Sequence, residues 1–243
     1  MTYFATENLH RAFGGVPAVD HATVEVLPGR VNGLIGPNGS GKTTFFNLVT
    51  GMIAADGGRV VFRDGDLTGR RPHQVARAGI GRTFQVTRLL PRMTVLDNML
   101  VAVQRPRLRQ LLTSRASAAD VERAEGWLRR VGLEHLRDRE ARLLSYGQQK
   151  LLEIVSVLMA DPDLVLLDEP AGGVNPVMIE RIAALVRLLN AEGRTFLIVE
   201  HNMELVMSLC DHVVVFAAGA PIAAGSPAQV RADPRVLEAY LGD

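Results

Sequence analysis

The chain has 243 residues, of which 47% are hydrophobic and 22% charged, with a formal net charge of +1. This composition is typical of a globular protein of one or two domains, and it excludes a disordered chain and a collagen-like fibre. The single cysteine, Cys210, excludes a disulfide framework and a cysteine-rich zinc site, and it favours a reducing compartment.

The sequence has no segment that is expected to enter a membrane. The N-terminal residues, MTYFATENLHRAF, lack the basic region and the following apolar region of a signal peptide. The longest apolar stretch, residues 213–225, is interrupted by glycines and by Pro221, and it is shorter than the roughly 18 residues of a membrane helix. We therefore expect a cytoplasmic protein that reaches a membrane only through a partner.

Arginine is concentrated in one part of the chain. Residues 63–142 contain 17 Arg, no Lys and 9 Asp or Glu. A basic block of this kind can indicate nucleic-acid binding. Here acidic residues are mixed with the arginines on helix-like stretches, and aromatic residues are few. We interpret the block as a solvated or partner-facing helical surface, and we expect no nucleic-acid partner.

The first part of the chain has the pattern of β structure around one helix. Strand patterns occur at residues 23–27, 31–35 and 59–62. Turn signals stand at Gly57-Gly58 and at Asp64-Gly65. A helix is expected over residues 42–49, ended by Gly51.

The middle of the chain has helical patterns. Residues 119–131 place their apolar side chains on one helix face, and residues 148–160 are more apolar throughout, which indicates a buried helix. Residues 105–117 are rich in arginine and serine, and we expect a surface loop or a frayed helix there.

The last part alternates short apolar runs with helix patterns. The strand patterns are residues 163–167, 195–199 and 213–216. The helix patterns are residues 176–190, with Pro176 near the first position, and residues 202–210. Buried strands that alternate with helices predict an α/β fold, with a mainly parallel sheet covered on both faces. The helical middle is interpreted as an insertion into this fold.

A phosphate-binding pattern, G-x-x-x-x-G-K-[ST], occurs at residues 36–43 as GPNGSGKT. Its glycines let consecutive backbone N–H groups surround phosphate oxygens, and the helix that follows directs its positive end at the same oxygens. Lys42 adds a charge near the β- and γ-phosphates, and the hydroxyl of Thr43 can bind Mg²⁺. Because a strand pattern precedes the loop and a helix pattern follows it, we predict a nucleotide site.

Two adjacent carboxylates follow the apolar run that ends at Leu167. Asp168 and Glu169 would be costly to bury unless a cation meets them. Ligands of open α/β sheets lie at the carboxyl ends of the strands. We therefore expect Asp168 to hold Mg²⁺, directly or through water, and Glu169 to orient or deprotonate the attacking water.

A third motif, LSYGQQ at residues 144–149, lies between the phosphate loop and the acidic pair. With these motifs the chain resembles the ATP-binding subunits of ABC transporters over essentially its whole length, and the segment is similar to the family signature LSGGQ. The resemblance implies that ATP binds between two subunits. Ser145, Gly147 and Gln148 of one subunit would then face the γ-phosphate held by the other, where a helix N-terminus favours an anion.

Three further positions match family motifs. Gln85, in GRTFQ, matches the glutamine that reaches Mg²⁺ and the attacking water. His201, in VEHN, matches the switch histidine that contacts the γ-phosphate. Phe13 stands where the family stacks an aromatic ring on adenine.

The resemblance thus implies ATP and Mg²⁺ as cofactors, together with a set of site residues. The implied catalytic residues are Lys42, Gln85, Glu169 and His201, and the implied magnesium ligands are Thr43, Gln85 and Asp168. The implied nucleotide contacts are Phe13, Gly36, Pro37, Asn38, Gly39, Ser40, Gly41, Lys42, Thr43, Thr44, Ser145, Gly147 and Gln148.

Two positions depart from the family pattern. Tyr146 replaces the first glycine of the signature, so the segment is expected to approach a partner's nucleotide differently. Asn175 stands where the family usually has an aspartate. An asparagine keeps the hydrogen bonding but loses the charge, which leaves open the role of this position in communication between the two sites.

Several segments are more specifically similar to the larger, LivG-type ATPase subunit of importers for branched-chain and other hydrophobic amino acids. These segments are residues 81–85, 93–98, 144–149, 169–176 and 236–242. The implied fold is the P-loop ABC ATPase fold as a single domain over residues 1–243, with an antiparallel β part. Residues 1–85 and 161–243 would form the α/β core, and residues 86–160 the inserted helical subdomain.

The resemblance implies an ATPase that energises an importer by ATP-driven closure of a dimer. The implied partners are a second ATPase subunit (a LivF-type paralogue or a second copy), two membrane permease subunits and, indirectly, a periplasmic or lipid-anchored solute-binding protein. The chain would then lie at the inner face of the cell membrane, with a permease helix held near Gln85.

Other functions stay open at this point. They are the ATPase of another transporter (urea or amide import, or lipopolysaccharide-type export), a non-transport ABC ATPase that acts on DNA or ribosomes, and a nucleotide-binding module that does not hydrolyse ATP.

Overall fold

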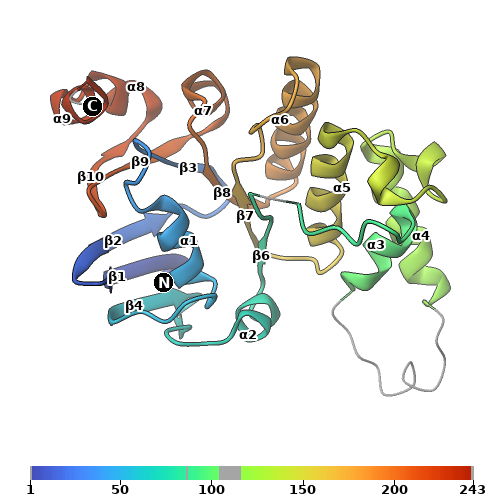
Figure 1. The fold of residues 1–243 in the computed structure, drawn as a ribbon, viewed down its shortest axis with the longest axis horizontal. Helices are drawn as coiled ribbons and strands as arrows, with labels where there is room; N and C mark the ends of the chain where they lie inside the picture. Colours follow the sequence, from blue (N-terminus) through green and yellow to red (C-terminus); the bar gives the residue numbers. More distant parts are fainter. Residues whose placement is uncertain (1, 86, 104–115, 242–243) are drawn as a thin grey trace.

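The computed structural model describes residues 2–85, 87–103 and 116–241, which form two β-sheets and a group of helices (Figure 1). The smaller sheet is antiparallel, with strand order β2-β1-β4-β5. Its strands are β1 (Phe4–Phe13), β2 (Val16–Val26), β4 (Gly57–Phe62) and β5 (Gly65–Asp66).

The larger sheet has six strands in the order β10-β9-β3-β8-β7-β6. These strands are β3 (Val31–Ile35), β6 (Ile80–Arg82), β7 (Leu164–Asp168), β8 (Thr195–Val199), β9 (His212–Ala217) and β10 (Ala220–Gly225). All neighbours are parallel except β9 and β10, which are antiparallel. Parallel neighbours require long crossover connections, and the helices between the strands supply them.

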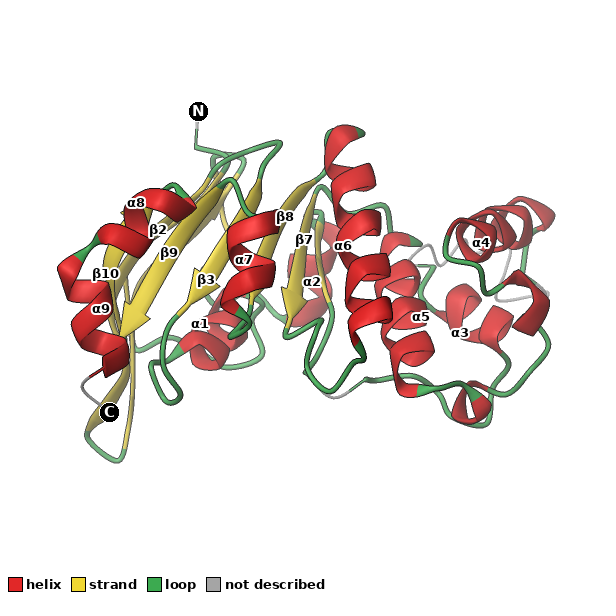
Figure 2. Ribbon diagram, turned by 90° about the horizontal axis from the view of Figure 1, so that it is seen from above, coloured by secondary structure: helices red, strands yellow, loops and turns green. Residues whose placement is uncertain are grey.

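The helices lie on both faces of the larger sheet and beyond its β6 edge (Figure 2). They are α1 (Lys42–Val49), α2 (Pro72–Arg77), α3 (Val95–Val101), α4 (Ala118–Arg130), α5 (Tyr146–Leu158), α6 (Pro176–Ala191), α7 (Met203–Leu209), α8 (Pro227–Ala232) and α9 (Pro234–Leu241). Helices α3, α4 and α5 lie together, far from α8 and α9. In the described part of the chain, none of the helices combines the length and the apolar character needed to span a bilayer.

Strand β7 is buried on both faces because successive side chains of a strand point to opposite sides. Leu164 and Leu166 join a hydrophobic cluster that also contains Phe45 of α1 and residues of the smaller sheet. Val165 and Leu167 join a second cluster with α5, α6 and α7. The carboxyl end of β7 is therefore held between two packed layers, which fixes the residues that follow it.

The predicted α/β fold, with a mainly parallel sheet and an antiparallel β part, is confirmed. The predicted strands 31–35 and 195–199 and the predicted helix 42–49 have the expected bounds. The helix expected over 148–160 instead covers Tyr146–Leu158, because Ser145 and Gln148 form a capping box that begins it two residues earlier.

Eight of these strands and helices were not predicted: β1, β5, α2, β6, α3, β10, α8 and α9. Most of them are short, and β1, although long, is interrupted by register shifts that disturb the alternation of apolar and polar residues. Residues 104–115, most of the stretch for which a loop or frayed helix was expected, lie outside the described residues.

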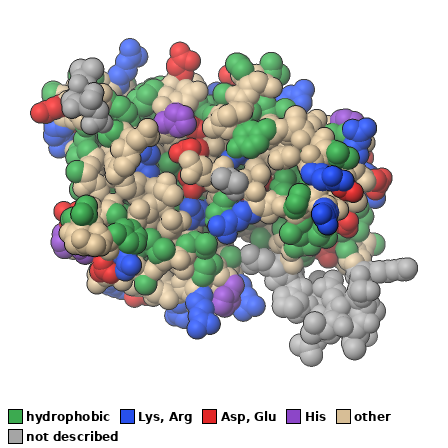
Figure 3. Space-filling model, viewed as in Figure 1, with side chains coloured by type: hydrophobic (Ala, Val, Ile, Leu, Met, Phe, Trp, Pro, Cys, Tyr) green, Lys and Arg blue, Asp and Glu red, His purple; other side chains and the backbone are tan. Residues whose placement is uncertain are grey.

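Basic and acidic side chains are interspersed over the face of the molecule seen in Figure 3. Several arginines of the basic block pair with carboxylates. Arg129 pairs with Glu134 at 3.2 Å, and Arg130 pairs with Glu192 at 2.8 Å. This arrangement fits the interpretation of the block as a solvated helical surface.

Candidate nucleotide site

The phosphate loop, residues 36–43, joins the end of β3 to the start of α1. Gly36 and Gly41 have φ angles of 150° and 99°. A Cβ atom at Gly36 would lie 2.1 Å from the carbonyl oxygen of Phe216, and one at Gly41 would lie 2.2 Å from that of Ala18. Both the backbone conformation and the close approach of neighbouring carbonyls therefore require glycine at these two positions.

The side chain of Lys42 folds back into its own loop. Its Nζ donates hydrogen bonds to the carbonyl oxygens of Gly36 (2.7 Å) and Pro37 (2.8 Å) and to Oγ of Ser40 (3.3 Å). Burial lowers the pKa of Lys42, and the nearby Glu169 carboxylate opposes this shift. A buried ammonium group that only neutral oxygens satisfy favours a charged acceptor such as phosphate.

The other loop residues differ in exposure. Asn38, Gly39 and Thr43 are exposed, Ser40 is buried, and Thr44 is half-buried. The Thr43 side chain, on the first turn of α1, is therefore open to a ligand held at the start of this helix.

Phe13 lies at the end of β1, and 48% of it is exposed. The guanidinium carbon of Arg11 lies 4.9 Å from the centre of its ring, and Arg11 also pairs with Asp56 at 2.6 Å. Among the described residues, no hydrogen bond or ring contact joins Phe13 to the phosphate loop.

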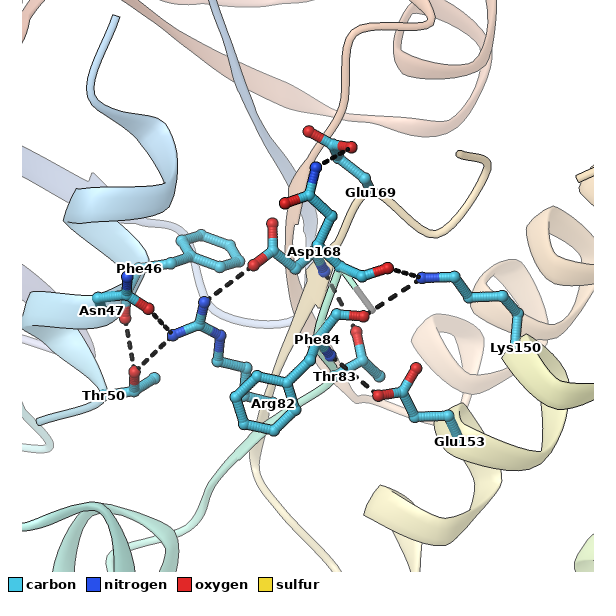
Figure 4. Close-up of polar contacts among 11 residues, drawn as sticks. Phe46, Asn47, Thr50, Arg82, Thr83, Phe84, Lys150, Glu153, Asp168 and Glu169 are labelled. Atoms are coloured by element: carbon cyan, nitrogen blue, oxygen red, sulfur yellow. Dashed lines mark hydrogen bonds and ion pairs between the residues drawn. The ribbon is translucent and has the colours of Figure 1, made fainter. Parts of the chain in front are cut away.

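Asp168 is held by an arginine that the sequence analysis did not assign to the site (Figure 4). Arg82 donates from Nη2 to Oδ2 of Asp168 (2.8 Å), and both side chains are more than nine-tenths buried. Nη1 of the same arginine donates to Oδ1 of Asn47 and to Oγ1 of Thr50, each at 2.8 Å. Arg82 thus connects the end of β7 to α1.

The second carboxylate oxygen of Asp168, Oδ1, is buried and has no hydrogen-bond partner among the residues that the structure describes. Buried polar atoms are normally satisfied by protein, water or a cation, so this oxygen marks a place for a ligand. Carboxylate, hydroxyl and amide oxygens are the ligands that Mg²⁺ prefers. Asp168, Thr43 and Gln85 therefore fit a magnesium ion by the chemistry of their donors.

The structure brings Glu169 and Gln85 together. Nε2 of Gln85 donates to Oε2 of Glu169 at 2.9 Å, from a segment 84 residues away in the chain. Glu169 has a φ of 46°, and its backbone N–H donates to the carbonyl oxygen of Val199 on β8 (2.9 Å). The carboxylate is therefore positioned by both its side chain and its backbone.

Helix α5 holds the Gln85 segment through two charged side chains (Figure 4). Nζ of Lys150 donates to the carbonyl oxygens of Phe84 (3.2 Å) and Gln85 (2.9 Å). Oε1 of Glu153 accepts a hydrogen bond from the backbone N–H of Phe84 (3.1 Å). Burial lowers the pKa of Lys150 and raises that of Glu153, and their mutual attraction opposes both shifts.

His201 follows β8, and 61% of its side chain is exposed. Its Nδ1 lies 4.0 Å from Oε2 of Glu200, a carboxylate that is fully buried. The imidazole is thus accessible, while its neighbour in the sequence points into the protein.

The signature segment does not join the other motifs within one chain. Ser145 begins α5, with its Oγ accepting from the N–H of Gln148 (3.4 Å) and the Gln148 side chain accepting from the N–H of Ser145 (2.9 Å). Helices α1 and α5 lie on opposite sides of β7 in both views (Figures 1 and 2). The described chain therefore brings the phosphate loop, Gln85, Asp168 and Glu169 together. Ser145, at the start of α5, lies on the other side of β7 from the phosphate loop.

Comparison with known proteins decides the family. Residues 19–172 match the ABC transporter family, and residues 220–243 match the branched-chain amino acid ATP-binding cassette transporter family. The chain is 41% identical to the high-affinity branched-chain amino acid transport ATP-binding protein LivG of Escherichia coli strain K12, over 98% of this chain and 97% of that protein. The corresponding protein BraF of Pseudomonas aeruginosa is also 41% identical, over 95% and 94%. The chain belongs to the ABC transporter family.

Two solved structures of an ATP-binding cassette of an ABC transporter are similar to this ABC protein. One is nucleotide-free and the other has the ADP conformation, and each has a TM-score of 0.89, 40% identity and full coverage of both chains. The ABC ATPase fold that the resemblance implied is therefore confirmed.

The structure shows the surroundings of both departures from the family pattern in this ABC protein, and it explains Asn175. The Tyr146 ring lies beside Gly173, where an added Cβ would be 3.3 Å from Cε1 of the ring, and 43% of Tyr146 is exposed. Asn175 begins α6, and its Oδ1 accepts from the N–H of Met178 (3.0 Å). Asparagine and aspartate are about equally good at this capping position, so the helix start does not need the charge.

The sequence analysis missed four residues of this site: Arg82, Lys150, Glu153 and Glu200. Lys150 and Glu153 had a signal, because they are charged residues three positions apart in a helix that was predicted to be buried. Arg82 belongs to the GRTFQ motif and Glu200 to the VEHN motif, but the sequence analysis assigned a role only to Gln85 and His201 in these motifs.

Proposed function

We propose that this chain is the ATP-hydrolysing subunit of an importer for branched-chain or other hydrophobic amino acids. The observation that carries the proposal is the 41% identity to LivG and BraF over nearly the full length of each chain. The separate match of residues 220–243 to the branched-chain family supports the same solute class, because it lies outside the general ABC match at residues 19–172.

In the proposed site, the phosphates of ATP lie in the loop of residues 36–43, and Phe13 stacks on the adenine. Thr44 and the exposed residues of the loop contact the same phosphates. Phosphate oxygens are stronger acceptors than the carbonyls of Gly36 and Pro37, so the Lys42 ammonium exchanges those partners for the nucleotide.

Hydrolysis requires a water molecule placed against the γ-phosphate. Glu169 orients or deprotonates this water, and the amide of Gln85, 2.9 Å from the carboxylate, holds it in place. His201 contacts the γ-phosphate. Thr43, Gln85 and Asp168 would hold Mg²⁺, which would supply positive charge to the phosphates when bound.

The Ser145 segment supports a working dimer, because it lies apart from the phosphate loop of its own chain. Ser145, Gly147 and Gln148 face the nucleotide of a second ATPase subunit, which is a LivF-type paralogue or another copy. Two permease subunits bind this pair at the inner face of the membrane, and a solute-binding protein delivers the amino acid.

The decisive experiment is co-purification with candidate permease subunits, followed by ATPase assays in proteoliposomes. With its solute-binding protein present, phosphate release should rise on addition of leucine, isoleucine or valine and not on addition of lysine or glutamate. Stimulation by urea, or by no amino acid, would contradict the proposed solute class.

The matched control is Lys42→Ala in the same complex. This variant should lose nucleotide binding and all stimulation while co-purifying normally, because Lys42 lies in the phosphate loop and not on the α3–α5 side of the molecule.

A further inference from the structure

Glu200, the residue after β8, is a buried carboxylate to which the family motifs give no role. None of its surface is exposed to solvent. Its Oε1 accepts a hydrogen bond from the backbone N–H of Ala171 at 2.7 Å. Its Oε2 accepts from the N–H groups of His201 (3.1 Å) and Asn202 (3.3 Å). Three backbone donors thus converge on one side chain, which compensates for the loss of water.

These bonds connect two segments that both carry proposed catalytic groups. Ala171 lies two residues after Glu169 and is 29 residues away from Glu200 in the chain. The N–H of Glu169 itself donates to the carbonyl oxygen of Val199 at 2.9 Å. The turn that carries Glu169 is therefore tied at two points to the end of β8, where His201 begins the next turn.

The bonds are not needed to begin the following helix. Helix α7 starts after Asn202, whose own Oδ1 accepts from the N–H of Leu205 at 3.1 Å. The local capping role is already filled, so the contact of Glu200 with Ala171 has to be explained by what it joins.

We propose that Glu200 is a positioning residue that locks the Glu169 turn to the His201 turn, so that the two groups keep one relative placement at the γ-phosphate. This inference rests on the proposed function. An ionised carboxylate suits the position because it only accepts hydrogen bonds, whereas a glutamine would direct its NH₂ group at one of the three N–H donors.

Two variants of Glu200 test the positioning role, one by changing the length of the side chain and the other by removing its charge. Glu200→Asp keeps the charge but is one methylene too short to reach both segments, and Glu200→Gln keeps the length but loses acceptors. In each, the kcat for ATP hydrolysis should fall on the order of 10- to 100-fold, as expected for misplaced reacting groups. The affinity for a fluorescent ATP analogue should stay within about twofold, since substrate-contacting groups are unchanged.

The control is Thr195→Val at the other end of β8. Oγ1 of the buried Thr195 accepts from the N–H of Gly29 at 2.9 Å, so this variant removes a partly buried hydrogen bond of the same strand away from the site. It should lower the Tm without changing kcat. If the Glu200 variants keep the wild-type kcat, the positioning role is wrong. It is also wrong if Thr195→Val, with an equally lowered Tm, loses as much kcat as the Glu200 variants do.

Hydrogen–deuterium exchange tests the bridge without any turnover. The amide of Ala171 should exchange faster in Glu200→Asp than in the wild type, and the same amide should be unchanged in Thr195→Val. Unchanged exchange at Ala171 in Glu200→Asp would overturn the inference. If the wild-type complex releases no phosphate, the proposed function fails, and the exchange result still decides whether Glu200 joins the two turns.

Discussion

Arg82 contacts three residues of two segments at the candidate site. Its guanidinium group connects Asp168 at the end of β7 with Asn47 and Thr50 of the α1 region, each at 2.8 Å. Burial lowers the pKa of Arg82, and the hydrogen bond to Asp168 opposes the shift. The ion pair thus occupies Oδ2 of the carboxylate, while Oδ1 has no hydrogen-bond partner among the described residues and can accept a ligand.

The variant Arg82→Ala should destabilise the protein strongly. It leaves the buried Asp168 carboxylate without its cation, a change that typically costs about 3–5 kcal/mol. Urea unfolding followed by circular dichroism measures the loss. Arg130→Ala is the control, because the Arg130–Glu192 pair is more than two-fifths exposed on each side and should change stability by less than about 1 kcal/mol. Equal effects of the two variants would contradict this account of Asp168.

Helix α5 connects two segments of the candidate site. Its start carries Ser145 and Gln148, and one turn further Lys150 and Glu153 hold the backbone on either side of Phe84. The same rigid helix therefore joins the signature segment to the Gln85 segment. A movement of α5 would displace Gln85 relative to Glu169.

The variant Lys150→Met should uncouple this connection. It removes both donors to the carbonyls of Phe84 and Gln85 while keeping the length of the side chain. We expect kcat to fall on the order of 10- to 100-fold, with ATP affinity retained. Stopped-flow phosphate release and nucleotide titration measure the two quantities. Arg123→Met, which removes a donor to the carbonyls of Leu158 and Met159 at the other end of α5, should hydrolyse ATP like the wild type.

Strand β9 contains a group that makes stability depend on pH. Burial lowers the pKa of His212, and Glu25 opposes the shift. The pKa of His212 in the folded protein lies below its unfolded value of 6.5. As the pH falls below 6.5, the unfolded chain therefore binds more protons at this residue than the folded protein does. The contribution of His212 to stability is thus complete above pH 6.5 and is lost as the pH falls through the folded pKa.

The variant His212→Gln should reduce this dependence. The difference in Tm between pH 7.5 and pH 5.5, measured by calorimetry, is expected to be smaller than in the wild type. His73→Gln, at an exposed position of α2, should keep the full difference. An unchanged difference in His212→Gln would show that other groups cause the acid sensitivity.

At the scale of the whole molecule, the proposed function makes the candidate site one half of a site that two subunits share. The chain offers a phosphate loop on one side of β7 and a signature helix on the other. Two such molecules, placed head to tail, would complete two sites. In the proposed function, ATP would bind both surfaces only in the closed pair, so its differential affinity would drive closure and its hydrolysis would reopen the pair.

The variant Glu169→Gln should trap the closed pair. It keeps the phosphate loop but loses the base, so hydrolysis should slow by about 10²–10⁴-fold while ATP still binds. Size exclusion with light scattering should show an ATP-dependent dimer, either of this chain alone or with the second ATPase subunit added. Lys42→Ala should stay monomeric with ATP. Wild-type turnover in Glu169→Gln would refute the assignment of the base.

The phosphate loop and the acidic pair could be predicted from the sequence because their geometry is local. The glycines, the start of α1 and the end of β7 lie within a few residues of the groups that they position. Strands 31–35 and 195–199 were predictable for a similar reason, since each is a continuous apolar run buried on both faces.

Only the tertiary structure decided which side chains hold these motifs in place. Arg82 reaches Asp168 across 86 residues, Lys150 reaches Gln85 across 65, and Glu200 reaches Ala171 across 29. No local pattern encodes such pairs, because they arise when neighbouring strands and helices pack together. The amino-acid sequence by itself thus determined which chemical groups form the candidate phosphate site, and the packing of α5, β7 and β8 determined how these groups are aligned.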